Sequence, residues 1–312
     1  MNDLIIGHKK IIDFFAKVIA AGNLSHAYCL VGPDQVGKKT VVEHISAKIF
    51  GVPVGKLKLQ LDYILVEQEI NAKTDKMNKN ISSEQIRDLR LFLSQKSFLG
   101  GYKIAIIDMA EKMNDSSANI LLKTLEEPKG KTVLFLITRN ENLLPQTIQS
   151  RCQMIFFQPV EKKLIKQYTI ECGLNEKDAE GITKLSAGLP GRAHRFVENR
   201  EEYDEYKQEM LRFIFLFNRP FYEKLSKVDE LFGDKTDHIA TREKLYNILD
   251  IWLAVLRGFL HSNAGILEKK IKIELSNEKL LNLSKLIFEA KDFLGANIHL
   301  RLLVEQILLE LP

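Results

Sequence analysis

The chain has 312 residues, with 45 lysines and arginines against 41 aspartates and glutamates, and a net charge of +4. Its length predicts two or three domains, and so small a charge excess argues against a chain that binds nucleic acid over its whole surface. No run of about 18 apolar residues is present to cross a membrane, and the first ten residues lack the apolar core of a signal peptide. The three cysteines, Cys29, Cys152 and Cys172, are too widely spaced for a disulfide framework or a zinc site. We therefore expect a cytoplasmic protein that binds no zinc.

The first half of the chain alternates between short apolar segments and helical patterns. The predicted strands are Ala27–Val31, Tyr63–Val66, Lys103–Asp108, Thr132–Thr138 and Gln153–Phe157. Near-continuous apolar runs of this length are typical of parallel strands that are covered on both faces. Helices are predicted at Lys38–Phe50, Ser83–Gln95 and Asp115–Glu127. This alternation predicts an α/β fold with a doubly wound parallel sheet and helices on both faces.

The second half has no convincing strand pattern. Short helical patterns occur at Lys162–Cys172 and Asp178–Leu185, and a long amphipathic stretch begins at Glu201 and ends with a helix at His299–Leu311. We predict an α/β P-loop domain over residues 1–159, a small helical lid domain over residues 160–200, and a helical bundle over residues 201–312.

A phosphate-binding loop is the first functional signal. The segment from Gly32 to Thr40, Gly-Pro-Asp-Gln-Val-Gly-Lys-Lys-Thr, follows a predicted strand and opens a helix with the spacing of the P-loop. Backbone N–H groups at the helix N-terminus, which follows Gly37, can cradle phosphate, and Lys38 can supply a charge to the terminal phosphates. The next residue is normally a serine or threonine whose hydroxyl binds Mg²⁺, but here it is Lys39, and Thr40 comes one residue late. This departure favours a loop that binds ATP or ADP without hydrolysing it, or one that no longer binds nucleotide, over a hydrolysing site.

Asp108 is the second signal, because an aspartate that ends an apolar strand is the Walker B pattern for holding Mg²⁺. The glutamate that would follow in an active ATPase is replaced by Met109, and Glu111 comes two residues later. The alternative interpretation is that Asp108 only ends a strand or caps a helix.

Two motifs downstream resemble the clamp-loader AAA+ family of bacterial DNA polymerase III. One is the segment from Asp108 to Pro128, which ends in Leu-Leu-Lys-Thr-Leu-Glu-Glu-Pro, and the other is Ser150-Arg151-Cys152. Weaker similarities are His26-Ala-Tyr28, Gly188-Leu-Pro-Gly-Arg-Ala193, and residues 296–305, which are similar to the family's collar helix. The resemblance extends from about residue 5 to residue 200 and then to the C-terminal helix.

The resemblance implies roles for individual residues. Arg151 would be an arginine finger that reaches into the ATP site of a neighbouring subunit. Thr138, at the end of the fourth strand, would be the sensor 1 residue. Arg192 would be the sensor 2 arginine, with a structural salt bridge as the alternative.

The resemblance also implies an assembly. The chain would join gamma/tau-like and delta-like subunits in a ring that loads a sliding clamp onto primed DNA, with DNA contacts through phosphates. The residues Lys39 and Met109 favour a subunit that hydrolyses no ATP itself. The alternative is an ATP-hydrolysing gamma-type subunit that uses Thr40 and Asp108 for Mg²⁺ and Glu111 or another carboxylate as the base.

One departure from the resemblance lies after the P-loop helix, where many relatives carry a four-cysteine zinc module. Residues 51–81 contain no cysteine, so we expect that module to be absent. The polar, lysine-rich stretch Glu67–Asn80 is predicted to be a solvated loop.

Overall fold

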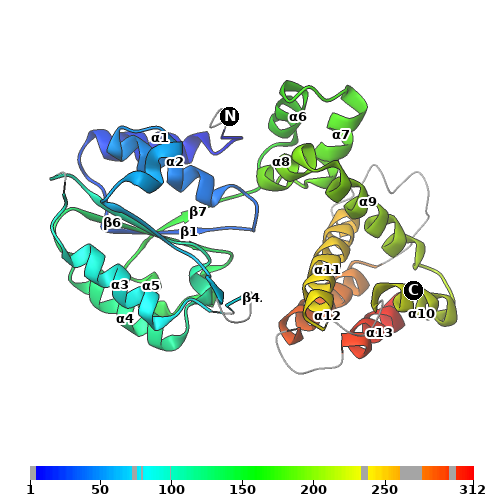
Figure 1. The fold of residues 1–312 in the computed structure, drawn as a ribbon. Coiled ribbons are helices and arrows are strands. Elements are labelled where there is room, and N and C mark those ends of the chain that lie inside the picture. Colours follow the sequence, from blue (N-terminus) through cyan, green and yellow to red (C-terminus); the bar gives the residue numbers. More distant parts are fainter. Residues whose placement is uncertain are drawn as a thin grey trace. The chain divides into compact units, whose positions relative to one another are not determined.

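The computed structural model describes residues 5–71, 76–78, 80–98, 100–232, 238–260, 276–294 and 300–312. The contacts between residues divide the chain into two compact units, Met1–His194 and Arg195–Pro312. Figure 1 shows the elements of both. The first unit contains the sheet together with the helices predicted for the lid, and the boundary expected near residue 159 stays a prediction. Within the described residues, no helix is long and apolar enough to cross a membrane.

A five-stranded parallel sheet forms the centre of the first unit. Its strands are β1 (Ala27–Val31), β2 (Tyr63–Val66), β5 (Lys103–Ile107), β6 (Thr132–Thr138) and β7 (Gln153–Phe156), in the order β2-β5-β6-β1-β7. All pairs in this sheet are parallel. The five strand predictions are confirmed, with β5 and β7 each one residue shorter than expected. The order places β1, which precedes the P-loop, and β5, which precedes Asp108, on either side of β6.

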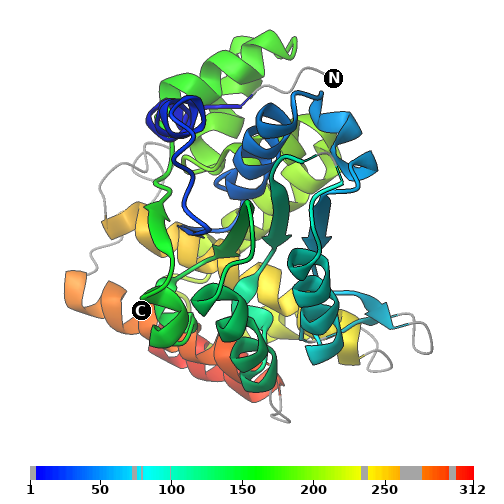
Figure 2. The same cartoon turned by 90° about the vertical axis from the view of Figure 1, so that its left-hand side faces the viewer.

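Helices cover both faces of the sheet. Helices α1 (Lys9–Ala20) and α2 (Lys38–Phe50) lie on one face, and α3 (Ser83–Ser94) and α4 (Asp115–Glu126) lie on the other, as Figures 1 and 2 show from two sides. Residues of β1 alternate between the two layers: Tyr28 and Leu30 pack in the core under α1 and α2, and Cys29 packs under α3 and α4. Because both faces are buried, apolar residues are required at every position of the strand. The expected doubly wound α/β fold is confirmed.

Helix α3 begins where the sequence predicts. The Ser82 hydroxyl accepts a hydrogen bond from the backbone N–H of Gln85 at 3.2 Å, and the Gln85 side-chain oxygen accepts one from the Ser82 N–H at 2.9 Å. This reciprocal capping box satisfies two N–H groups that the first turn would leave unpaired.

The prediction of an open loop over Glu67–Asn80 is wrong in part. Strands β3 (Ile70–Asn71) and β4 (Lys76–Met77) pair there as a small antiparallel ladder, and residues 72–75 and 79 lie outside the described residues. Two-residue strands are too short for the apolar alternation by which strands are recognised in a sequence. Helix α1 also lies outside the elements predicted above.

Shorter elements connect these layers. They are the 3₁₀ helices η1 (Val54–Leu59), η2 (Ala110–Lys112) and η3 (Glu141–Leu143) and the one-turn helix α5 (Gln146–Gln149). The helices predicted after residue 160 are α6 (Lys162–Glu171) and α7 (Glu176–Leu185), and α8 (Pro190–Glu198) follows them.

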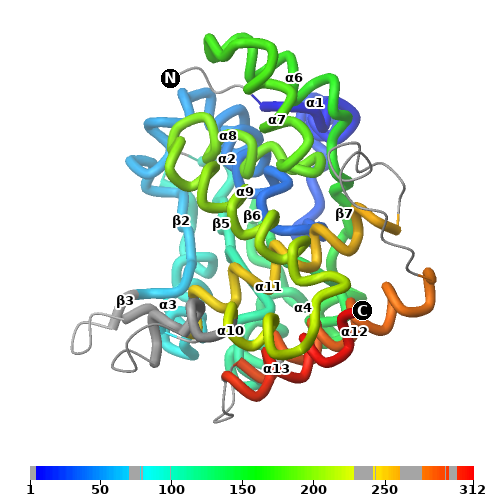
Figure 3. The backbone as a smooth tube through the Cα atoms, turned by 90° about the vertical axis from the view of Figure 1, so that its right-hand side faces the viewer, coloured from blue at the N-terminus to red at the C-terminus, as the bar shows by residue number. Residues whose placement is uncertain are grey.

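The second unit is helical, as predicted. It contains α9 (Arg200–Phe215), α10 (Phe221–Phe232), α11 (His238–Leu260), α12 (Asn277–Phe293) and α13 (Leu300–Glu310), which Figure 3 traces from green to red. Trp252 of α11 is 1% exposed and stacks on Phe213 of α9, with ring centroids 4.5 Å apart, and its indole N–H donates to Glu209 at 2.7 Å. The aromatic pair and its buried polar end fix the position of α11 against α9. The expected C-terminal helix is α13; residues 295–299, which include the start of the segment likened to a collar helix, lie outside the described residues.

The aromatic layer under α1 provides a stability test of the first unit. Phe135 of β6 is fully buried and stacks on Tyr28 at a centroid distance of 5.6 Å. We expect Phe135→Ala to lower the free energy of unfolding by about 3–5 kcal/mol, because it removes a large apolar side chain and leaves a cavity. Phe98→Ala, at a side chain that is 68% exposed, should change it by less than about 0.5 kcal/mol. Urea unfolding of the full chain, followed by circular dichroism, measures both; equal effects would contradict this packing.

Candidate functional site

The P-loop lies between β1 and α2, at the carboxyl end of the sheet's strands. Gly37 precedes the first residue of α2 and has φ +100°, a left-handed conformation that glycine adopts without strain. At Gly32 a Cβ atom would come within 2.5 Å of the Phe157 carbonyl oxygen, so no larger residue fits there. The loop therefore leads into a helix N-terminus whose unpaired N–H groups attract anions. This is the geometry of a phosphate cradle.

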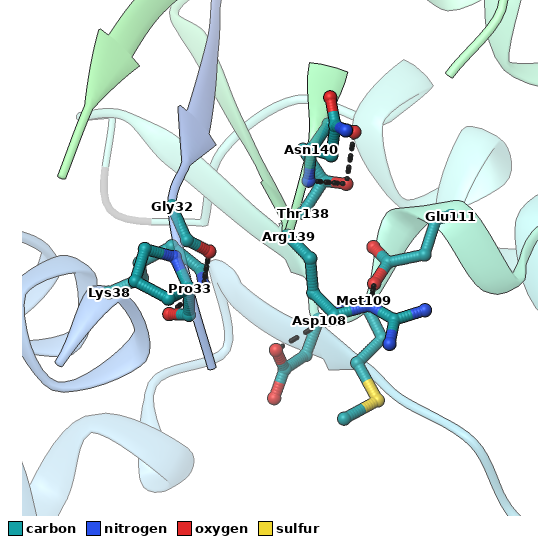
Figure 4. Close-up of polar contacts among 9 residues, drawn as sticks. All are labelled: Gly32, Pro33, Lys38, Asp108, Met109, Glu111, Thr138, Arg139 and Asn140. Carbon is teal, nitrogen blue, oxygen red and sulfur yellow. Dashed lines mark hydrogen bonds and ion pairs between the residues drawn. The ribbon is translucent and has the colours of Figure 1, made fainter. Parts of the chain in front are cut away.

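Lys38 is held by the backbone of its own loop. Its side chain is 6% exposed, and its Nζ donates hydrogen bonds to the carbonyl oxygens of Gly32 at 2.5 Å and Pro33 at 2.8 Å (Figure 4). Burial lowers the pKa of Lys38, and the nearby charges of Asp34, Glu111 and Asp108 oppose that shift. The ammonium that would contact phosphate is therefore already positioned inside the loop.

Lys39, the unusual residue of the motif, lies between two carboxylates. Its Nζ is 2.8 Å from Oε2 of Glu67 and 3.1 Å from Oδ2 of Asp108. Burial lowers the pKa of Lys39, but hydrogen bonds to Glu67 and Asp108 and their negative charges outweigh it, so the pKa is raised. The side chain therefore stays positively charged beside Asp108. Thr40, the next residue, is exposed.

The carboxylates that could serve hydrolysis are each engaged within the chain. Asp108 follows β5 directly, and its Oδ1 accepts the N–H of Met109 at 3.1 Å. The Glu111 side chain is 3% exposed and pairs with Nε of Arg139 at 3.0 Å (Figure 4). Met109 is 41% exposed and carries no group that can accept a proton from water. Met109, where the resemblance leads us to expect a catalytic glutamate, thus offers only a thioether.

The two predicted sensor residues lie at the same edge of the sheet. Thr138 ends β6, is 1% exposed, and donates its hydroxyl to the carbonyl oxygen of Asn140 at 3.0 Å. Arg192 of α8 donates from Nε to the side-chain oxygen of Gln35 at 3.2 Å, and the neighbouring Gly191 N–H donates to the Gln35 carbonyl at 2.8 Å. A Cβ atom on Gly191 would lie 2.9 Å from that carbonyl oxygen. The start of α8 is therefore attached directly to the P-loop.

A second contact to the P-loop comes from the N-terminal segment, and no sequence pattern predicts it. Nε2 of His8 lies 2.7 Å from the carbonyl oxygen of Val36, and the imidazole packs on Phe157 with centroids 4.8 Å apart. Burial lowers the pKa of His8, and the hydrogen bond to Val36 opposes the shift. At Gly7 a Cβ atom would come within 2.6 Å of Val160, so the chain passes close to the segment that precedes α6. The only sequence signal is a Gly-His pair ahead of an amphipathic helix, which fits no motif.

Arg151 lies at the opposite edge of the sheet. It belongs to the turn between α5 and β7, and because β7 is parallel to β1, the start of β7 and the end of β1 point to opposite edges. Its guanidinium donates to the Thr147 carbonyl and to Glu126 of α4, both at 2.9 Å. The Arg151 side chain is 35% exposed and that of Glu126 is 49% exposed. Such exposed ion pairs contribute about 0–1 kcal/mol to stability. Glu126 therefore orients the Arg151 side chain, and breaking this ion pair costs little free energy.

Cys152, which follows this arginine, is not a candidate nucleophile. Burial raises its pKa to about 12, so the thiol stays protonated at neutral pH. No group of three or more histidine, cysteine, aspartate or glutamate side chains within the described ranges could hold a metal ion; the expectation that zinc does not bind stays a prediction.

The residues at the loop fit a nucleotide phosphate better than they fit Mg²⁺. The helix N-terminus, Gly37 and Lys38 form a positively polarised cradle. A divalent cation needs the Asp108 carboxylate and a hydroxyl at the Lys39 position, but the carboxylate is paired with an ammonium and the hydroxyl is missing. The donor set for magnesium is therefore incomplete.

The comparisons with known proteins agree with the fold. A family model described as "DNA polymerase III, delta subunit" matches residues 7–161. The DNA polymerase III subunit delta′ of Pseudomonas aeruginosa is 39% identical over 142 residues, which is 41% of this chain and 42% of that protein. The Escherichia coli subunit delta′ is 32% identical over 120 residues, 38% of this chain and 36% of that protein. The chain thus spans less than half the length of these two relatives in the matched segments. The Bacillus subtilis subunit delta′ is 25% identical over 341 residues, 100% of this chain and 97% of that protein.

A solved structure shares the architecture. The gamma subunit-related DNA polymerase III protein of Thermotoga maritima superposes with a TM-score of 0.50 at 19% identity, over 95% of this chain and 97% of that one. With the P-loop, the five-stranded sheet and the helical units that follow it, these similarities define an AAA+ P-loop protein. Among proteins of that class, the chain is similar to the clamp-loader family, and within that family to the delta-prime subunits.

The charge cluster at Lys39 leads to a measurable pKa change. Replacing Asp108 by asparagine should lower the pKa of Lys39, because one of the two negative charges that raise it is removed. In the unchanged chain this lysine should stay protonated above the ordinary lysine value of about 10.4, and its stabilising effect on the fold should disappear only as the pH rises through the raised pKa. NMR titration of the Lys39 side chain measures the shift. Asp115→Asn, at an exposed aspartate of α4, is the matched control, and an Asp108→Asn titration that coincides with it would refute the assignment.

Proposed function

We propose that this chain is a delta-prime-type clamp-loader subunit that hydrolyses no ATP and lends Arg151 to the ATP site of a neighbouring gamma/tau-like subunit. With a delta-like subunit these chains form a ring that opens a sliding clamp and places it on primed DNA, which the ring contacts through backbone phosphates. The P-loop of this chain retains ATP or ADP without turning it over. The observation that carries the proposal is the position of Arg151, half-exposed at the edge of the sheet opposite the chain's own P-loop.

That position supports a role toward a second molecule. Arg151 precedes β7 and the P-loop follows β1, so the length of the sheet separates them within one chain. A planar guanidinium offers paired donors that suit the three spread charges of a phosphoryl group in transfer. Since the partners of Arg151 among the described residues are exposed, it can exchange Glu126 for a phosphate of a neighbouring site.

The absence of hydrolysis is supported by three residues at the other edge. Lys39 pairs with the aspartate that would hold Mg²⁺, Met109 replaces the catalytic glutamate, and Glu111 is paired with Arg139. An attacking water would therefore lack both the metal that neutralises developing charge and a positioned base.

The finger is tested in a reconstituted clamp loader with clamp and primed DNA. Arg151→Ala should slow hydrolysis at the receiving site by on the order of 10³-fold, with assembly unchanged by size-exclusion chromatography. Arg151→Lys should not restore turnover, because an ammonium lacks the planar fork. Glu126→Gln, which removes the partner and keeps the arginine, should leave turnover close to that of the unchanged ring. Equal turnover with and without Arg151 would reject the trans role.

The gamma-type alternative is tested on the isolated chain. We expect ATP turnover of the purified chain to equal that of Lys38→Ala, because neither has a complete hydrolytic site. A steady-state phosphate-release assay in excess Mg²⁺ measures this. Turnover that disappears on Lys38→Ala would show that the chain is an autonomous ATPase and would overturn the non-hydrolysing role.

A further inference from the structure

We propose that the Lys39 ammonium takes the place of the divalent cation at this P-loop, so that the site binds a nucleoside di- or triphosphate without Mg²⁺. The inference rests on the proposed retention of nucleotide and goes beyond it by naming the cation that accompanies the ligand.

The contacts of Lys39 are those of a built-in cation. Its Nζ bridges Glu67, which follows β2, and Asp108, which follows β5, at 2.8 and 3.1 Å. The two strands are neighbours and parallel, so both carboxylates lie at the same edge as the loop. An ammonium has three N–H donors, and two face these carboxylates. The third suffices for one phosphate oxygen.

The positive charges of the loop also favour phosphate binding without a metal ion. Lys38 and Lys39 are consecutive, so the loop carries two ammonium groups at the helix N-terminus instead of one. Each is a compact charge of the kind that P-loops direct at phosphate. Mg²⁺ in addition would have to approach Asp108 against an ammonium already 3.1 Å from its oxygen. Its preferred octahedral shell of oxygen ligands would also lack the usual hydroxyl.

Replacing Lys39 by threonine should make nucleotide binding depend on Mg²⁺. Threonine at position 39 supplies a hydroxyl and frees the Asp108 carboxylate, so the site regains the two groups that a P-loop uses for Mg²⁺. The same change removes one of two positive charges from the cradle. Nucleotide affinity should therefore become dependent on Mg²⁺ in that variant alone.

The test is calorimetric titration of the full chain with ADP, in EDTA and in excess Mg²⁺. For the unchanged chain we expect the two dissociation constants to agree within about threefold, because the Asp108 carboxylate is paired with Lys39 and the hydroxyl that would complete a Mg²⁺ site is replaced. For Lys39→Thr, binding in EDTA should be at least about tenfold weaker than in Mg²⁺, through loss of a close charge–charge contact. Lys56→Thr, the same replacement at an exposed lysine of η1, should behave like the unchanged chain.

The ADP affinity of Asp108→Asn is a second measurement. It should change in opposite directions for a site that needs a metal ion and for a site in which Lys39 is the cation. Where a metal is required, losing this carboxylate weakens ADP binding. Where Lys39 is the cation, losing it removes a negative charge beside the phosphates, so ADP binding in EDTA should tighten, by about two- to fivefold.

Three results would overturn the inference: binding of ADP by the unchanged chain only in Mg²⁺, no binding in either buffer, or weaker binding by Asp108→Asn in EDTA. The trans role is judged separately, by turnover of the ring with and without Arg151. A metal requirement here would leave that role intact, and failure of Arg151 to affect the ring would leave the ADP titration interpretable.

Discussion

The parallel direction of the five strands is the constraint on which the rest of the molecule depends. Because every strand points the same way, the residues that follow β1, β5 and β6 gather at one edge of the sheet, and the turn that precedes β7 lies at the other. The first edge holds the phosphate cradle, Asp108 and Thr138; the second holds Arg151. One chain therefore presents a nucleotide-type site and an exposed arginine in positions that its own fold keeps apart.

The acidic side chains at the first edge of the sheet form ion pairs with basic side chains of the same chain. Two carboxylates near the P-loop are paired with cationic side chains: Asp108 pairs with Lys39, and Glu111 pairs with Arg139. Buried or half-buried carboxylates need such partners, since an unpaired charge in a poorly solvated place is costly. The contacts that stabilise this edge of the sheet thus engage both carboxylates with cations of the same chain.

Much of this could be predicted from the sequence. Apolar runs such as Ala27–Val31 identify buried parallel strands because both faces are covered, and the Ser82–Gln85 cap marks the start of α3 because its pattern is local. The motif Ser150-Arg151-Cys152 and the segment that ends at Pro128 together indicate the resemblance to clamp loaders, because both are contiguous in the sequence. The two-residue strands β3 and β4 escape prediction because so short a ladder leaves no periodic signal.

The contacts of the site could not be predicted in the same way. Lys39 stands out as an irregular residue, but its pairing with Glu67 joins positions 28 residues apart and depends on β2 and β5 being neighbours. The contact of Gln35 with Arg192 spans 157 residues, and His8 reaches Val36 from ahead of α1. Such pairs are set by the topology of the sheet, and a single sequence carries no local pattern for them.

The pair between Arg151 and Glu126 has one more consequence. A free arginine side chain samples many rotamers, and fixing it at a binding partner carries an entropic penalty of about 1.5–2 kcal/mol. The hydrogen bonds to Glu126 and to the Thr147 carbonyl restrict that sampling within the chain itself. Since the pair is exposed, dissolved salt weakens it, and the population of the pre-set rotamer should fall as ionic strength rises. The rotamer population of Arg151 thus depends on the ionic strength of the solution as well as on the fold.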